Sequence, residues 1–321
     1  MLTGILACVL GINKIVNMSE YIFFPGIVKS AELLEKDMPV YGIVEDSLTY
    51  EMILAAQEQD EEQEKVVEEV TETTKVSDLN LTYDDIRSRY YTVDSTTVIG
   101  EEQLNIKDLM KYDTKIDQKT KGPKVLIFHT HSQEGFKNSK ETIVDMGKYL
   151  AKRLNQKGIE TMHHDGVYDL IDGKLDRSKA YQYSVAEVQE ILNENPSIEV
   201  VIDLHRDGLP ENKHLVINID GKPTAKIMYF NGLSRTKSNG DIEYLHNPYI
   251  DENLSFSFQM QLATESMYPG FARKIYLKGY RYSLHMMPKS LLIEAGAQTN
   301  TAEEIKNAMD LLANVLVEVL L

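Results

Sequence analysis

The sequence predicts an α/β fold in which helices flank a mostly parallel or mixed central sheet. From residue 122 onward, short apolar segments rich in β-branched residues alternate with longer segments whose apolar residues recur at helical spacing. Several of the short segments run directly into polar or charged residues. This arrangement is typical of open α/β sheets, in which ligands bind beyond the carboxyl ends of the strands.

Composition and charge restrict the function classes that fit this chain. Its 321 residues are 42% hydrophobic, which is enough for one large domain or two modest ones. The formal net charge of -16 and the absence of a basic stripe argue against nucleic-acid binding, since affinity for phosphate backbones depends on clustered Lys and Arg. Cys8 is the single cysteine, which excludes an intrachain disulfide and a thiolate-rich zinc site. A metal site in this chain must therefore use histidine and carboxylate ligands.

The N-terminal part differs from the rest in composition. Residues 1–17 are mainly apolar and, although they are shorter than the roughly 20 residues of a spanning helix, we predict a membrane segment there. Residues 18–81 are predicted to be a juxtamembrane region and a flexible acidic linker, because residues 57–74 are dense in Glu, Asp and Gln and have few large apolar residues for a core. Residues 82–121 regain apolar and aromatic residues, and we expect an arm packed on the body formed by residues 122–321.

This C-terminal body is expected to begin with a buried strand. Residues 125–128 are four β-favouring apolar residues that fit such a strand. Residues 143–156 then place apolar residues on one helical face, and Gly158 ends the helix. The next expected elements are a strand at residues 159–164, a helix at residues 178–193 and an apolar strand at residues 200–204.

A hairpin is expected next. The dipeptide Asp220-Gly221 favours a tight turn, and apolar segments flank it. We predict that strands at residues 215–219 and 225–230 form this hairpin.

A helix, a strand and a second helix complete the predicted fold. Residues 250–267 are predicted to be a long helix that ends before Pro269. Residues 290–293 form an apolar strand. The last helix is expected to start at a capping-box pair, Thr301 and Glu304.

Polar side chains that follow three of the predicted strands indicate a metal site. The first strand is followed by His131 and Glu134, whose spacing puts an imidazole and a carboxylate on one side of a single turn, while His205 and Glu294 follow two later strands. Three His and Glu ligands with an open fourth position are typical of a catalytic zinc. We therefore predict that His131, Glu134 and His205 bind Zn²⁺ and that Glu294 is the general base in hydrolysis of an amide. Residues 122–321 would then be a zinc hydrolase domain.

Two assignments around this site stay open. His129 lies two residues from His131 and on the same strand face, so it is the alternative ligand. We favour His131 because only it has Glu134 one turn away. Arg206 or Asp207 is expected to stabilise an oxyanion or to orient a ligand imidazole, and Arg206 is the predicted catalytic cation.

The other histidines are interpreted as structural. A single histidine at a strand end is more often a hydrogen-bonded structural residue than a metal ligand. Asp203, inside its strand, is predicted to support the ligands from behind. The histidines interpreted as structural are His163, His164, His214, His246 and His285.

Three stretches of the sequence carry a resemblance to a known family. They are Pro-Lys-Val-Leu-Ile-Phe-His-Thr-His-Ser-Gln-Glu-Gly-Phe from Pro123, Val-Ile-Asp-Leu-His-Arg-Asp from Val201, and Leu-Leu-Ile-Glu-Ala-Gly-Ala-Gln-Thr-Asn-Thr from Leu291. In this order and spacing they resemble the stage II sporulation protein P family, which is related to zinc-dependent N-acetylmuramoyl-L-alanine amidases. The resemblance extends from about residue 92 to the C-terminus.

This resemblance implies an amidase-like zinc hydrolase fold and a function in the cell wall. It implies a peptidoglycan hydrolase of endospore-forming bacteria, with amidase and endopeptidase activity, that acts with sporulation proteins D and M during engulfment. It also implies a single-pass anchor in the cell membrane, with the catalytic domain on the extracytoplasmic side, in the intermembrane space of the sporulating cell. By this likeness His131, Glu134 and His205 fall at zinc-ligand positions and Glu294 at the position of the catalytic carboxylate.

Two other functions are carried as alternatives. A metallocarboxypeptidase-like hydrolase also uses His-x-x-Glu, a later histidine and a distant glutamate base, and Arg206, Arg273 and Arg281 are candidates to bind a free C-terminal carboxylate. A zinc-free wall-binding scaffold, anchored by its N-terminus, is the other. The mass of the reaction product and the metal content of the purified protein distinguish the three hypotheses.

Overall fold

The computed structural model of the chain describes residues 81–321. The predicted membrane segment at residues 1–17 and the predicted acidic linker, apart from Leu81, lie outside the described residues. Across residues 81–321, no helix combines the length and the apolar character that a membrane crossing requires.

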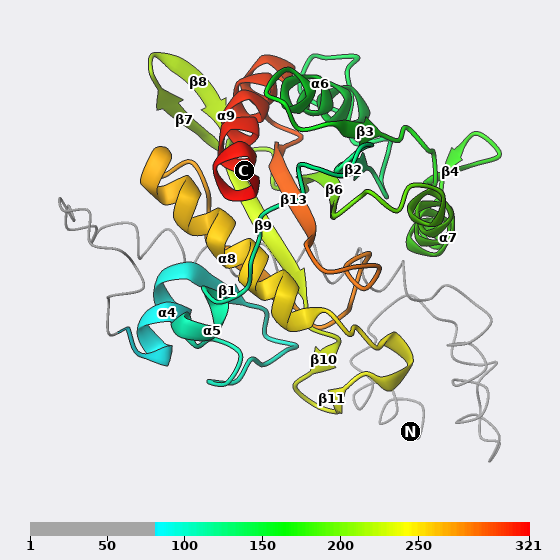
Figure 1. Ribbon diagram of the computed structural model, residues 1–321. Helices are drawn as coiled ribbons and strands as arrows, with labels where there is room; N and C mark the ends of the chain where they lie inside the picture. The colour runs from blue at the N-terminus through cyan, green and yellow to red at the C-terminus, as the bar shows by residue number, and fades with distance from the viewer. Residues whose placement is uncertain (1–80) are drawn as a thin grey trace, which may run out of the picture.

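A seven-stranded sheet forms the centre of the described structure (Figure 1). Its strand order is β1-β12-β9-β13-β6-β2-β3, and neighbouring strands are parallel except β9 and β13, which run antiparallel. The sheet is therefore mixed and mostly parallel, which confirms the predicted fold class. Its strands are β1 (Tyr91–Val93), β2 (Val125–Phe128), β3 (Thr161–His163), β6 (Val200–Asp207), β9 (Ile227–Gly232), β12 (Ile275–Lys278) and β13 (Ser290–Ala297).

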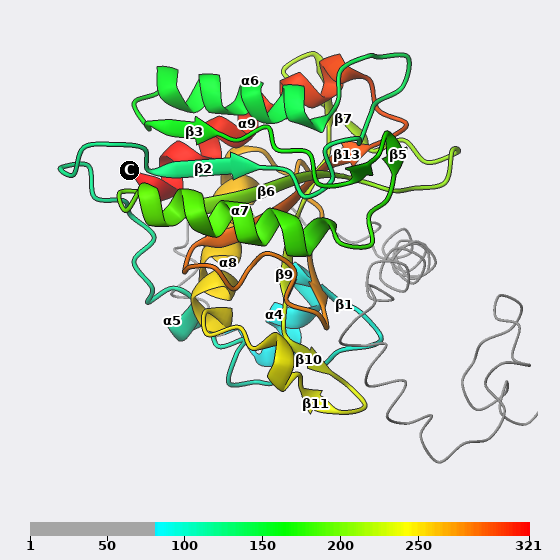
Figure 2. The same ribbon diagram turned by 90° about the vertical axis from the view of Figure 1, so that its right-hand side faces the viewer.

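Helices cover both faces of this sheet. In Figure 2, α7 lies in front of the strands, whereas α8 and α9 lie behind them. α6, α8 and α9 share an apolar core with strand residues such as Ile127, Ile202 and Ile293, while Val188 of α7 belongs to a second cluster with Phe128 on the opposite face. Burial of one such side chain contributes about 1.5–3 kcal/mol, so the alternation along the strands holds the layers together. The helices are α6 (Ile143–Gln156), α7 (Ala180–Glu194), α8 (Ile250–Met267) and α9 (Ala302–Leu320).

The helix signals in the sequence correspond closely to the observed helices. α6 and α8 have the predicted bounds, and α7 begins two residues later than predicted. Thr301 accepts a hydrogen bond from the backbone of Glu304, whose side chain accepts one from the backbone of Thr301, so the predicted capping box is present. These signals are local, and local side-chain chemistry is sufficient to set where a helix starts or ends.

Two strands continue beyond their apolar segments. β6 extends through His205 to Asp207, and β13 extends through Glu294 to Ala297. Parallel pairing between them continues to Glu294, the register partner of His205, and after a register shift Ala297 pairs with Asp207. The polar residues therefore lie within paired strands, and their backbone positions are set by the sheet.

The predicted hairpin is present, but its second strand is residues 222–225 and not the predicted residues 225–230. After the turn at Asp220 and Gly221, which have φ angles of 51° and 80°, the chain returns as β8 (Lys222–Ala225) to pair with β7 (Val216–Ile219). Two successive left-handed residues are the requirement of a type I′ turn, which Asp-Gly meets. The predicted strand at residues 225–230 is instead part of β9, a central strand of the main sheet.

Several elements were not expected from the sequence. The segment 82–121, predicted to be an arm, forms α4 (Tyr83–Tyr90) and α5 (Ile106–Leu109) and also supplies the edge strand β1, which pairs with β12. A second Asp-Gly turn, at Asp172 and Gly173, joins two short strands ahead of α7. The remaining short elements are β4 (Leu170–Ile171), β5 (Lys174–Leu175), β10 (Arg235–Thr236), β11 (Gly240–Asp241) and the 3-10 helix η3 (Glu243–Leu245).

Candidate metal centre

The first two predicted ligands lie in the loop that follows β2. Glu134 is held there by its backbone, because its carbonyl accepts a hydrogen bond of 2.8 Å from the amide of Ile143 at the start of α6. Gly135 and Thr142 form a β-bridge just beyond. His131 Nδ1 lies 3.6 Å from Glu134 Oε1. The loop thus presents an imidazole and a carboxylate to the same point.

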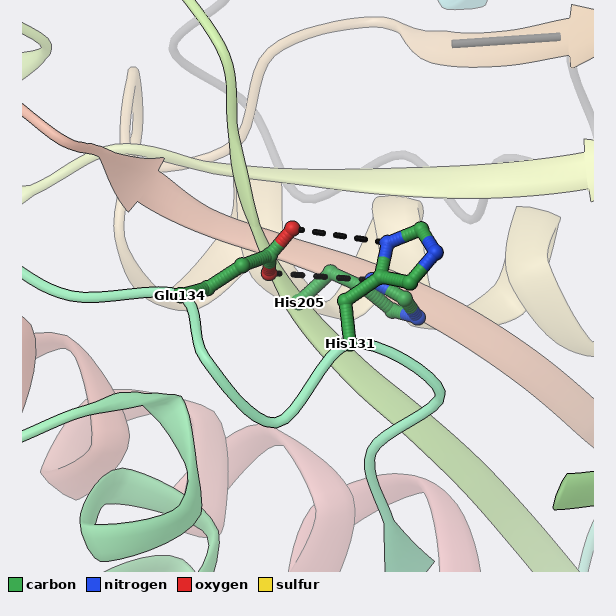
Figure 3. Close-up of side chains that lie close together, drawn as sticks. All are labelled: His131, Glu134 and His205. Carbon is green, nitrogen blue, oxygen red and sulfur yellow. Dashed lines mark ion pairs between the residues drawn. The ribbon is translucent and has the colours of Figure 1, made fainter. Parts of the chain in front are cut away.

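His205 on β6 brings the third ligand to this point. Its Nδ1 lies 3.7 Å from Glu134 Oε2, and one donor atom from each of His131, Glu134 and His205 falls within 4.8 Å of the others (Figure 3). Ligands that bind zinc tetrahedrally at 2.0–2.1 Å stand about 3.3 Å apart, so the separations of His131 and His205 from Glu134 are close to those of a zinc site. The three residues are 7%, 4% and 3% exposed, respectively. Two imidazoles and one carboxylate at these distances fit a zinc ion in donor type and in spacing.

The charged groups in this cluster stabilise one another electrostatically. Burial by itself raises the pKa of Glu134, but the imidazoles of His131 and His205 outweigh it and hold that pKa well below its usual value. Burial lowers the pKa of His205, but Asp203 and Glu134 outweigh it and raise that pKa well above its usual value. Glu134 is therefore a carboxylate anion in the folded protein, the form in which it can bind a cation.

Asp203 orients His205 from the side away from Glu134. Its Oδ1 lies 2.8 Å from His205 Nε2, which leaves Nδ1 directed toward Glu134. The buried carboxylate also accepts hydrogen bonds from the amide and hydroxyl of Thr130, at 2.9 and 2.7 Å, and from the hydroxyl of Ser283 at 2.8 Å. A carboxylate behind a histidine ligand fixes its ring orientation and increases its basicity. This is the supporting position that the sequence predicts for Asp203.

The structure places His129 outside the cluster. Its Nδ1 lies 2.8 Å from the carbonyl of Leu204, and its Nε2 lies 3.0 Å from His163 Nε2. Both ring nitrogens are thus used within the fold. The sequence argument that put His129 and His131 on one strand face fails because β2 ends at Phe128, so strand alternation does not continue into the loop.

Glu294 projects from the same face of the sheet as His205, because the two are register partners on adjacent strands. Its Oε2 atom is buried and has no hydrogen-bond partner within residues 81–321. Burial raises the pKa of Glu294 to about 8, and the nearby carboxylate of Asp207 adds to the increase. A buried carboxylate oxygen without a partner is costly, and a bound cation or a polar substrate group beside it would satisfy it.

Arg206 has different contacts from those predicted. Its backbone amide donates a 2.9 Å hydrogen bond to Glu134 Oε2, while its guanidinium donates to the carbonyls of Gly135 and Asp207 at 3.2 and 3.0 Å. The side chain therefore links the loop after β2 to the end of β6. Its catalytic role stays a prediction, and these contacts favour positioning of Glu134. Arg273, not singled out as catalytic, donates a 2.7 Å hydrogen bond to Asp207 on the side of Glu294.

Three residues near the cluster were missed by the sequence analysis. Arg177 Nη2 lies 3.5 Å from Glu134 Oε1, and the ring of Tyr181 packs edge-on against His131 with centroids 5.6 Å apart. Buried Asp169 accepts hydrogen bonds from the amide and hydroxyl of Ser132, at 3.1 and 2.7 Å. Arg177 and Asp169 flank the turn at Asp172-Gly173, so this second Asp-Gly dipeptide is the signal that would have pointed to them.

The five histidines interpreted as structural lie outside the three-residue cluster. His163 contacts His129 as described above. His164 Nε2 lies 2.6 Å from the hydroxyl of Tyr168, and His214 Nε2 lies 2.8 Å from Glu304 Oε2. Ring contacts of this kind agree with hydrogen-bonded histidines of the fold.

Comparisons with known proteins agree with the resemblance seen in the motifs. A model of the stage II sporulation protein P family matches residues 29–317. Stage II sporulation protein P of Bacillus subtilis (strain 168) is 24% identical over 247 residues, which are 68% of this chain and 58% of that protein. The chain thus spans less than two thirds of the length of this relative.

Two solved structures are also similar to the chain at low identity. An N-acetylmuramoyl-L-alanine amidase from Clostridium difficile 630 is 18% identical, with 62% of this chain and 95% of that chain covered and a TM-score of 0.40. The N-acetylmuramoyl-L-alanine amidase AmiC2 of Nostoc punctiforme is 15% identical, with 62% and 98% covered and a TM-score of 0.37. The family match covers most of the chain and confirms the resemblance in the three motifs. The chain belongs to the stage II sporulation protein P family.

Proposed function

We propose that this chain is a zinc-dependent peptidoglycan hydrolase of sporulation that cleaves the amide between N-acetylmuramic acid and the stem peptide. The observation that carries the proposal is the buried cluster of His131, Glu134 and His205, whose donor atoms lie within 4.8 Å of one another, with Glu294 on the neighbouring strand. Membership of a sporulation family supports the cell wall as the substrate. Cleavage of the peptide cross-link is part of the same proposal.

The reaction adds one water molecule across the amide. The bond between the lactyl carbonyl carbon and the alanine nitrogen breaks, a carboxylic acid forms on the sugar side, and the stem peptide leaves with a free amino group. A bound Zn²⁺ would supply Lewis-acid chemistry, acidifying a water and polarising the scissile carbonyl. His131, Glu134 and His205 would hold the ion.

We assign proton transfer to Glu294. As the register partner of His205, it lies beside the ligand set, and its Oε2 has no hydrogen-bond partner within residues 81–321. In its ionised form it takes a proton from the attacking water and gives that proton to the leaving nitrogen. The charges of Asp207, His205, Glu134 and Arg273 act on this carboxylate, and Arg273 donates a hydrogen bond to Asp207.

A defined muropeptide tests the reaction. Purified protein incubated with an N-acetylmuramoyl pentapeptide should release an intact stem peptide, identified by mass. His205→Ala and chelation should both abolish release, and added zinc should restore activity only to the chelated wild type. Full activity after either treatment contradicts the proposal.

The same product analysis tests the alternatives. A metallocarboxypeptidase-like hydrolase would release a single terminal amino acid and leave the sugar-peptide amide intact. A scaffold would release nothing, and purification without chelators would yield protein without stoichiometric zinc. Of the arginines considered for a carboxypeptidase, Arg206 and Arg273 are engaged by the contacts described above, and Arg281 donates to the carbonyl of His246 at 3.2 Å.

The cellular setting is part of the proposal. We propose that residues 1–17 anchor the chain in the cell membrane and that residues 122–321 act on the extracytoplasmic side, in the intermembrane space of the sporulating cell. Sporulation proteins D and M are the proposed partners, on the basis of family membership. Membrane fractionation with protease protection, and co-purification from sporulating cells, test these points. Release of the chain in the soluble fraction, or no co-purification, contradicts them.

A further inference from the structure

Arg177 lies between β5 and α7, at the edge of the candidate metal centre. Its Nη2 is 3.5 Å from Glu134 Oε1, and its Nε is 4.0 Å from Asp169 Oδ2. Charge-assisted hydrogen bonds are usually about 2.7–2.9 Å, so both contacts are longer than hydrogen bonds. Within residues 81–321, Nε has no hydrogen-bond partner. The guanidinium is held near two carboxylates, and its Nε, a buried atom, is an unpaired donor.

The exposure of these groups indicates which side of the cluster Arg177 occupies. The side chain of Arg177 is 25% exposed, whereas those of Glu134 and Asp169 are 5% and 0% exposed. The Arg177 side chain therefore reaches solvent beside these buried carboxylates. A ligand that approaches the metal centre from solvent would meet it.

The backbone around Arg177 is fixed relative to the metal loop. The carbonyl of Arg177 accepts a 3.1 Å hydrogen bond from the amide of Ala180, and the backbone amide of Asp176 donates a 2.9 Å hydrogen bond to the carbonyl of Asp169. Asp169 in turn binds the amide of Ser132 in the loop that carries His131 and Glu134. Asp169 thus connects the β4–β5 hairpin to the loop after β2. This connection sets the distance between Arg177 and the candidate metal centre.

We propose that Arg177 binds a carboxylate of the leaving peptide and selects stem peptides whose second residue has a free carboxylate. This inference rests on the proposed amidase function. Consecutive Cα atoms are about 3.8 Å apart, so a carboxylate on the second residue lies roughly 6 Å from the scissile nitrogen. Arg177 Nη2 is 3.5 Å from Glu134 Oε1, an atom of a proposed metal ligand, so the guanidinium borders the position proposed for the scissile amide. A planar guanidinium can bind a carboxylate through two parallel hydrogen bonds, which a neutral carboxamide cannot match.

A pair of substrates tests the selection. The two N-acetylmuramoyl tripeptides are identical except that the second residue carries a free carboxylate in one and a carboxamide in the other. For the wild type, KM should be about 10- to 100-fold lower for the free carboxylate, as expected for a charge-assisted hydrogen bond. Arg177→Gln should remove this difference by raising KM for the free carboxylate, and Arg177→Lys should restore part of it. Arg153→Gln is the matched control, because Arg153 pairs with Asp310 at 2.6 Å on the surface of α6 and should keep wild-type selectivity.

Three outcomes would overturn the inference. The first is equal KM of the wild type for both substrates. The second is a fall in kcat of Arg177→Gln that is the same for both substrates, which assigns the guanidinium to the developing oxyanion. The third is loss of stoichiometric zinc in Arg177→Gln and Arg177→Lys, which assigns it to the support of Glu134.

A binding measurement separates this inference from the proposed function. Calorimetry of both tripeptides with zinc-loaded Glu294→Gln should give the same preference for the free carboxylate, because binding does not require turnover. Tight, selective binding without cleavage by the wild type would refute the amidase proposal and leave the role of Arg177 standing. Cleavage of both tripeptides without a preference in binding would support the amidase proposal and refute the role of Arg177.

Discussion

Two histidines follow the end of β2, His129 and His131, and each pairs with a histidine of another strand in different surroundings. His129 uses one nitrogen on a backbone carbonyl and the other on His163, at 2.8 and 3.0 Å. His131 and His205 instead direct their Nδ1 atoms to Glu134, at 3.6 and 3.7 Å (Figure 3). Both ring nitrogens of His129 are thus used by contacts within the fold. His131 and His205 instead direct nitrogen atoms that could bind a metal to a common point at Glu134.

Carboxylates account for the difference. Burial lowers the pKa of His129 to about 3, so its ring is neutral at physiological pH. His205 is as deeply buried, yet Asp203 and Glu134 reverse the effect of burial and raise its pKa well above the usual value. The position of a carboxylate, more than the position of a histidine along the chain, therefore identifies a candidate metal ligand.

Removal of one of the proposed zinc ligands should have the largest effect on activity. His131→Ala deletes one of three proposed ligands, so we expect loss of stoichiometric zinc and hydrolysis of muropeptides at background level. Metal analysis and product mass measure these effects. His214→Ala is the control, since His214 lies outside the cluster and contacts Glu304. A His131→Ala variant that retains zinc and activity would return His129 to consideration as the ligand.

Neutralising the proposed base should have the next largest effect. Glu294→Gln keeps the shape of the side chain but removes the proton acceptor, and we expect kcat to fall about 10²- to 10⁴-fold. Zinc content should equal that of the wild type, because Glu294 lies outside the three-ligand cluster. Parallel loss of zinc would make Glu294 a ligand, and retained kcat would exclude it as the base.

Deletion of the carboxylate behind His205 should have a smaller effect. Asp203→Asn keeps the volume but weakens the 2.8 Å contact that orients His205. Supporting groups of this type typically contribute 10- to 100-fold to metal affinity or activity. Competition with a chelator of known affinity measures the change, with Ser283→Ala as a control that removes one hydrogen bond to Asp203 but leaves its charge. Equal zinc affinity in Asp203→Asn and the wild type would exclude the orienting role.

The sequence predicts the residues of the site that come directly after an apolar segment. His205 and Glu294 follow apolar segments, and the structure pairs them as register partners. The choice between His129 and His131 depends on where β2 ends, and strand ends are not encoded by a local signal as strong as a helix cap. The end at Phe128 removes the alternation on which the sequence argument for His129 relied.

Other parts of the site depend on short elements that periodicity cannot detect. β1 has three residues and β4 and β5 have two each, too few to show an alternating pattern. Arg177 and Asp169 reach the centre only because the hairpin at Asp172-Gly173 folds against the ligand loop. The Asp-Gly signal was in the sequence, as it was at Asp220-Gly221, but only tertiary packing shows that one hairpin borders the metal centre.

The smallest effect on activity is expected from substitution of His129. His129→Ala should leave zinc stoichiometry unchanged and kcat within a few fold of the wild type, because both ring nitrogens of His129 serve the fold. The loss should appear in stability instead. The substitution leaves a buried carbonyl and the ring of His163 without partners, at a cost of about 1–3 kcal/mol in the free energy of unfolding. Denaturant unfolding of the zinc-loaded protein measures it, and loss of zinc at unchanged stability would place His129 in the metal centre.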